Sequence, residues 1–92
     1  MYSIDPTPND IAKELAKRHK ALRKQLKISQ AELAERSGVS LGSLKRFETT
    51  GHISLESLLK LANLLNRLQD FNSIFQAKDD MSKIEGLFTT NS

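Results

Sequence analysis

The chain has no cysteine among its 92 residues. Disulfide bonds, a thiolate nucleophile and a cysteine-based metal site are therefore excluded, and the absence suits a reducing compartment. No apolar run approaches the roughly 20 residues that cross a bilayer, and the N-terminus lacks the apolar stretch of a signal peptide. We therefore expect a cytoplasmic protein that makes no membrane contact.

The usual marks of catalysis are also missing. His19 and His52 are isolated, no carboxylate pair stands at a metal-ligand spacing, and there is no glycine-rich phosphate loop. His19 falls near an apolar stripe, and we interpret it as a partly buried structural histidine. The prediction is a protein that is not an enzyme and needs no cofactor and no metal.

Charge is distributed unevenly along the chain. Residues 1–50 hold ten Lys/Arg and six Asp/Glu, whereas residues 51–92 hold four and five. Seven basic residues and one acidic residue lie between Lys13 and Lys27. A basic half beside a near-neutral half indicates one side that faces a polyanion and another that serves a different contact. The alternative is a solvated basic helix.

The length predicts a single domain over residues 1–92. Within it we expect an arm at 1–7, a helical bundle at 8–78 and a C-terminal tail at 79–92. Apolar spacing predicts five helices and no strand, so the expected fold class is all-α, a five-helix orthogonal bundle. The helices are expected at about 8–26, 30–37, 41–49, after Ser54 and from Leu68.

Apolar stripes predict which faces of two helices are buried. The stripe of the first helix is Ile11, Leu15, Leu22 and Leu26, and that of the fourth is Leu55, Leu58, Leu59, Ala62 and Leu65.

The most informative stretch is residues 29–48, which reads as two short helices joined by a three-residue turn. Ser29 with Glu32 forms a capping box, Gly38 ends the first helix, and Ser40 caps the second. Along the second helix the apolar residues Leu44 and Phe47 point inward. The polar residues that are free to point outward are Ser43, Lys45 and Arg46. This layout is typical of a helix-turn-helix, whose second helix enters the DNA major groove.

This stretch resembles the helix-turn-helix of the Xre family, which includes the phage Cro and repressor proteins. The framework positions that match are Gln30, Ala34, Gly38, Val39 and Leu44. Ser37 departs, because it occupies a place that is often aliphatic. The resemblance covers roughly residues 8–75 and implies a lambda-repressor-like DNA-binding domain.

The resemblance and the position on the second helix imply which residues touch double-stranded DNA. Arg46 is the strongest candidate base reader, because arginine can grip guanine O6 and N7 together. Gly42 allows a close approach to DNA or is a tolerated helix defect, and both readings stay open. Base contacts are expected from Leu41, Gly42, Ser43 and Arg46, and phosphate contacts from Lys27, Ser29, Gln30, Lys45 and Thr49.

Arg23 and Glu48 occupy positions that pair in several members of the family. The resemblance therefore implies an ion pair that joins the first helix to the recognition helix. The alternative is two separate solvated side chains.

Apolar residues after the fourth helix exceed what a small bundle needs to close. A single helix-turn-helix module makes a small interface, so such proteins dimerise and read two half-sites of an inverted repeat. The expected dimer interface is Leu68, Phe71, Ile74 and Phe75. A larger intramolecular core is the alternative.

The segment FETTGHISLESLLKLANLL resembles antitoxins of the HipB type, which are encoded with a HipA-like kinase toxin. The implied function is a repressor that autoregulates a type II toxin–antitoxin operon; the alternative is a stand-alone prophage-type regulator. A docking element for the toxin is expected at Ile84, Leu87 and Phe88, unless these residues fold back onto their own dimer.

Overall fold

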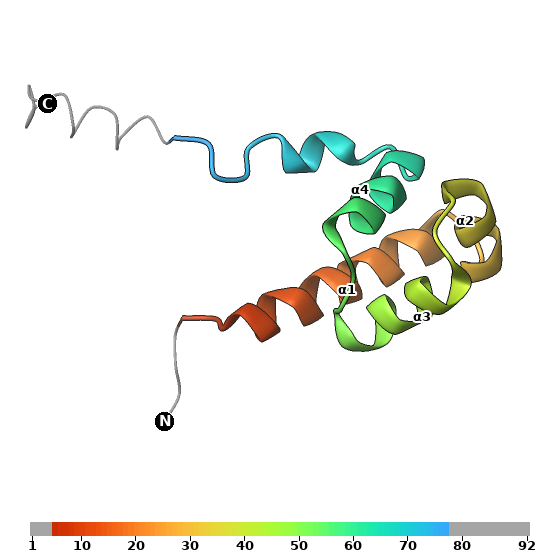
Figure 1. Ribbon diagram of the computed structural model, residues 1–92, viewed down its shortest axis with the longest axis horizontal. Coiled ribbons are helices and arrows are strands. Elements are labelled where there is room, and N and C mark those ends of the chain that lie inside the picture. The colour runs from red at the N-terminus through yellow and green to blue at the C-terminus, as the bar shows by residue number, and fades with distance from the viewer. Residues whose placement is uncertain (1–4, 78–92) are drawn as a thin grey trace, which may run out of the picture.

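The computed structural model describes residues 5–77. The elements in chain order are α1 (Pro8–Gln25), α2 (Gln30–Ser37), α3 (Leu41–Thr50), α4 (Leu55–Leu64) and the 3-10 helix η1 (Leu68–Phe71) (Figure 1). No strand occurs among the described residues, so this part of the fold is all-α. The expected tail, with Ile84, Leu87 and Phe88, lies outside them.

The expected count of five helices is wrong, because the fifth segment forms only one turn of 3-10 helix. The chain leaves α4 through Asn66, which has a φ of 62°, and turns without further helix from Asn72 to Phe75. Asn72 and Ser73 favour turns over helix because their side chains compete for backbone hydrogen bonds. The apolar spacing after Leu68 therefore does not signal a full helix.

Each α-helix begins at a hydroxyl that accepts a hydrogen bond from the backbone N–H three residues on. These caps are Thr7, Ser29, Ser40 and Ser54, at 3.0–3.1 Å. A cap of this kind contributes about 1 kcal/mol. Only the cap of α1 is a reciprocal capping box, with Asp10. The Glu32 carboxylate of α2 pairs instead with Arg36 at 3.0 Å, so the box predicted there is half made.

The centre of the core is made by α2, α3 and α4. Its largest fully buried side chains are Leu33, Leu44, Phe47 and Leu61. The packing is α1 on α3, α2 on both α3 and α4, and η1 on α4. Two details of α4 differ from expectation: Leu61 is fully buried, and Leu55 at the first position is exposed.

The buried face of α1 matches the predicted apolar stripe only at Leu22, which is partly buried and packs against the core. Ala16 and Arg23 are its buried residues, while Ile11 and Leu15 are exposed. The cause is a very close contact with the end of α3: a Cβ on Gly51 would lie 2.8 Å from the carbonyl carbon of Ala12. Only small residues fit at such a distance, so the leucines lie further round the helix.

Candidate nucleic-acid interface

The exposed face of α3 carries every candidate base contact. Leu44 and Phe47 are 0% and 1% exposed and fix the helix to the core, so the polar positions point outward. Gly38, with a φ of 83°, ends α2 in the left-handed conformation and leaves three residues before α3. The exposed residues of this face are Leu41, Gly42, Ser43, Lys45, Arg46 and Thr49.

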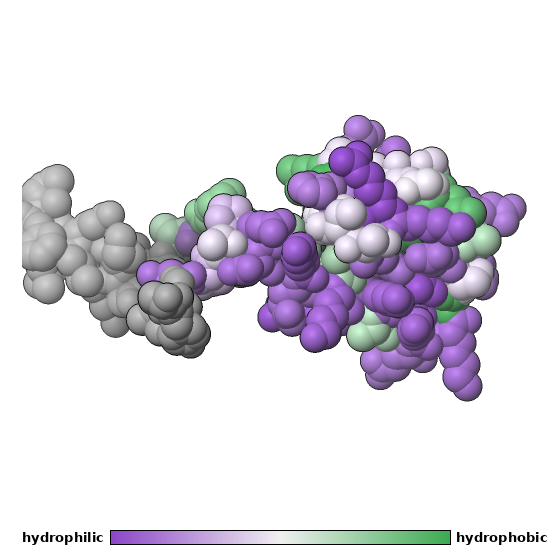
Figure 2. Space-filling view, turned by 90° about the horizontal axis from the view of Figure 1, so that it is seen from below, coloured by the Kyte–Doolittle hydropathy of each residue, from purple (hydrophilic) through white to green (hydrophobic). Residues whose placement is uncertain are grey.

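Hydrophilic side chains dominate the underside of the molecule, where α3 and the outer face of α1 lie (Figures 1 and 2). Hydrophobic side chains show there only in small areas (Figure 2). A face of this kind suits a polar, charged ligand better than an apolar partner.

Glu48 is the centre of a buried polar cluster that joins three helices. Its carboxylate accepts two hydrogen bonds from Arg23 of α1, each 2.9 Å, and one of 2.9 Å from the Gln30 amide of α2. The Nδ1 atom of His19 lies 2.8 Å from the same carboxylate. Arg23 also donates to the Ile28 carbonyl at 2.9 Å. The cluster therefore fixes α1, α2 and the connection between them against α3.

The structure thus brings together Arg23, Gln30 and Glu48 from the sequence analysis and adds His19. The side chains of Arg23 and Glu48 are 8% and 2% exposed, so the ion pair is shielded from solvent. His19 precedes Arg23 by four residues and therefore shares its face of α1. That spacing is the signal from which its place in the cluster could have been inferred.

The cluster sets the protonation states of its members. Burial alone would raise the pKa of the Glu48 carboxyl, but the hydrogen bonds from Arg23 and Gln30 and the charge of Arg23 bring it below 4.5. Burial lowers the pKa of His19 below 6.5 and outweighs the attraction of Glu48. The positive charge of Arg23 beside it lowers the pKa of His19 a little further. We therefore treat His19 as neutral, with Nδ1–H donating to Glu48.

The candidate phosphate contacts lie around the start of α2 and along α3. Gln30 is half-buried, and one of its two amide hydrogens is used by Glu48, which leaves the other for a phosphate. Ser29 is exposed but uses its hydroxyl oxygen as the cap of α2. Lys27 is exposed and has a φ of 60° in the turn before it.

A shallow polar hollow of about 230 Å³ lies between α3 and the start of α4. Two candidate base readers, Ser43 and Arg46, form one side of it, and His52, Ser54 and Ser57 form another. Sequence reasoning did not place these last three at the interface, because neither the loop between α3 and α4 nor the first turn of α4 has a recognisable DNA-binding motif.

Among residues 5–77 no group of three or more metal-binding side chains lies together. None of the helices in this range is long and apolar enough to cross a membrane.

The geometry defines a class: a helix-turn-helix whose second helix presents a polar face, as in DNA-binding transcription regulators. The profile of the helix-turn-helix family matches residues 20–69, which is more than half of the chain. The chain therefore belongs to the family of Xre-like helix-turn-helix proteins. No curated protein and no solved structure gives a match to it.

Proposed function

We propose that this protein is a cytoplasmic transcriptional repressor that binds an inverted-repeat operator as a homodimer. The observation that carries the proposal is the fixed presentation of α3: its apolar side is fully buried, and Glu48 ties it to α1 and α2 by hydrogen bonds of 2.8–2.9 Å. A recognition helix must enter the groove at a set angle, so rigid attachment to two other helices supports that use.

The exposed face of α3 divides into two roles. Arg46 reads a base, with Ser43, Leu41 and Gly42 beside it at the N-terminal part of the helix, where base edges come closest. Phosphates on either side are held by Lys27, Ser29, Gln30, Lys45 and Thr49. These contacts position the protein without reading sequence.

The basic side chains of α1 support the same orientation. Lys13, Lys17, Lys20 and Lys24 follow each other at spacings of four, three and four, which places them on one stripe of the helix, and all are exposed. Exposed cations of this kind supply the salt-dependent part of DNA affinity.

A binding-site selection followed by affinity measurements tests the proposal. Arg46→Ala should weaken binding by roughly 1–3 kcal/mol and relax the preference at one base pair. Arg36→Ala is the matched control, because Arg36 is an exposed arginine on α2 that pairs with Glu32. Recovery of no preferred sequence by the wild-type protein would overturn the function.

The finer proposal is an antitoxin that neutralises a HipA-like kinase toxin and represses its own operon. It rests on the resemblance of FETTGHISLESLLKLANLL alone, and its docking residues, Ile84, Leu87 and Phe88, lie outside the described residues. Co-expression with a kinase-like protein encoded beside it tests this: deletion of residues 81–92 should weaken the complex and spare DNA binding. If no kinase-like protein is encoded there, the stand-alone regulator is the better function.

A further inference from the structure

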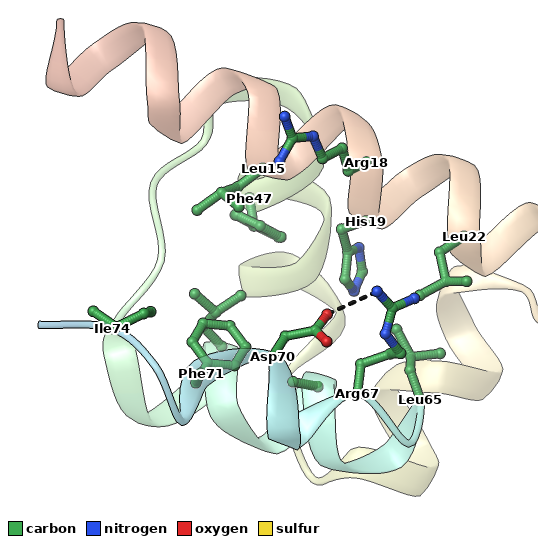
Figure 3. A pocket seen from close by; sticks show the side chains of 12 residues that line it. Leu15, Arg18, His19, Leu22, Phe47, Leu65, Arg67, Asp70, Phe71 and Ile74 are labelled. Carbon is green, nitrogen blue, oxygen red and sulfur yellow. Dashed lines mark ion pairs between the residues drawn. The ribbon is translucent and has the colours of Figure 1, made fainter. Parts of the chain in front are cut away.

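A pocket of about 360 Å³ opens between α1 and η1 (Figure 3). Leu15 and Leu22 of α1 form one wall, Phe71 and Ile74 form the opposite wall, and Phe47 of the core lies between them. Leu15, which is exposed, thus borders this pocket, as does Leu22, which also packs against the core. The pocket lining is mainly apolar, and the pocket is open to solvent on one side, so residues 5–77 by themselves leave it unfilled.

The polar groups at the pocket lie at one end and around the rim. The His19 ring reaches in from α1, and its Nε2 is buried without a hydrogen-bond partner among the described residues. Arg67 and Asp70 pair at 2.8 Å across this end (Figure 3), and Arg18 pairs with Glu14 at 3.2 Å on α1. Arg18 and Arg67 of the lining are therefore each paired with a carboxylate, of which Asp70 also lines the pocket and Glu14 does not.

Phe75 follows the pocket wall directly and is fully exposed, with a relative accessibility of 102%. Its φ of 64° places a bulky residue in the left-handed region, which such residues rarely adopt. Ile74 and Leu68 beside it are also exposed. An apolar projection next to an apolar pocket marks an interaction surface.

We propose that the pocket receives Phe75 of a second copy of this chain, and that the partner's pocket receives Phe75 of the first. A two-fold interface requires the projection and the pocket to lie on the same surface of one molecule. Ile74 lines the pocket and Phe75 is the next residue, so the projection and the pocket are neighbours on the molecule. Both arginines of the lining are already paired with a carboxylate, which favours a second copy of this chain over a strongly acidic partner.

This inference rests on the proposed homodimer and names its central contact. In this interface Phe71 does not project toward the partner. It is half-buried and forms part of the pocket wall that receives Phe75. The bottom of the pocket is linked to the recognition helix by two contacts. Phe47 packs edge-on against His19, with ring centroids 5.2 Å apart, and His19 contacts Glu48 of the recognition helix.

Cross-linking between single-cysteine chains tests the contact, because the native chain has no cysteine to interfere. Full-length Leu15→Cys and Phe75→Cys chains carrying different tags are mixed and oxidised. Leu55→Cys replaces Leu15→Cys in the control, since Leu55 is exposed but lies outside the pocket lining. We expect a mixed disulfide from the first pair and far less from the control. Equal yields from both pairs would overturn the proposal.

Sedimentation equilibrium supplies a second measurement on the full chain. Phe75→Ala should raise the dimer dissociation constant by about ten-fold or more, as expected for a central aromatic anchor, and Leu55→Ala should leave it within about two-fold. Circular dichroism verifies that the variants fold. A dimer unaffected by Phe75→Ala, or a wild-type chain that stays monomeric, would overturn the proposal. Operator binding is scored separately, so a chain that dimerises without binding DNA refutes only the proposed function.

Discussion

The two sides of α1 meet their neighbours in opposite ways. Toward α3 the contact is closed: Ala12 lies against Gly51, and Arg23 and His19 bond to Glu48 within 2.9 Å. Toward η1 the helix borders an open pocket, and leucines remain exposed. The difference indicates that the geometry of the side proposed to face DNA is set within one chain. The opposite side leaves apolar surface exposed, and there we propose that a second copy binds.

The largest expected effect comes from breaking the buried Arg23–Glu48 ion pair, which lies where α1 meets α3. Glu48→Gln leaves the buried Arg23 without a charged partner, which should lower the free energy of unfolding by about 3–5 kcal/mol. Glu32→Gln is the matched control, because the Glu32–Arg36 pair is about half exposed and should lose less than about 1 kcal/mol. Urea denaturation measures both. Similar losses for the two variants would show that burial of the Glu48 pair carries no special energetic weight.

The closeness of α1 and α3 can be tested with two glycines. Gly51 and Gly38 both end helices with positive φ, at 87° and 83°. Gly38→Ala adds a Cβ that meets nothing within 4 Å, so it should cost only the backbone strain, about 1–2 kcal/mol. Gly51→Ala adds the same strain and a clash with the Ala12 backbone, which should bring the loss above about 3 kcal/mol.

Thermal or urea unfolding of the two variants gives the difference directly. It should survive in the absence of DNA, because it arises within one chain. Equal losses would mean that α1 shifts away from Gly51 at little cost.

A smaller effect is expected from pH. The pKa of His19 is below 6.5 in the folded chain, so the unfolded chain binds a proton that the folded chain does not as pH falls below 6.5. The free energy of unfolding is therefore not reduced by His19 above pH 6.5 and declines as the pH falls below that value. Glu48 adds a second loss below pH 4.5, because its pKa is also lowered on folding. His19→Gln should flatten the first decline and keep the second, as measured by urea denaturation across pH.

Features that depend on near neighbours in the sequence could be predicted, whereas features that depend on residues far along the chain could not. The hydroxyl caps at Ser29, Ser40 and Ser54 and the left-handed Gly38 depend on neighbours within a few residues, and the structure agrees with them. The buried face of α1 depends on how closely α3 crosses it, which Gly51 decides from far along the chain. Periodicity alone therefore selected Leu15 where Ala16 is buried.

The candidate site shows the same division. Family resemblance named Arg23, Gln30 and Glu48, but it assigned Gln30 to DNA alone, whereas its amide also bonds to Glu48 at 2.9 Å. The sequence predicted only a structural role for His19, and its contact with Glu48 was not predicted. The pocket at η1 could not be anticipated, because the apolar spacing after Leu68 indicated a helix that would have filled this space.

The smallest expected effect decides between the two readings of Gly42. A Cβ added there meets no protein atom within 4 Å, and the backbone is helical, so the fold itself does not need glycine. Gly42→Ala should therefore stabilise the protein by about 0.5–1 kcal/mol. If Gly42 serves a close approach to DNA, the same variant should bind its selected operator more weakly despite folding better. Unchanged affinity together with higher stability would make Gly42 a tolerated defect of the recognition helix.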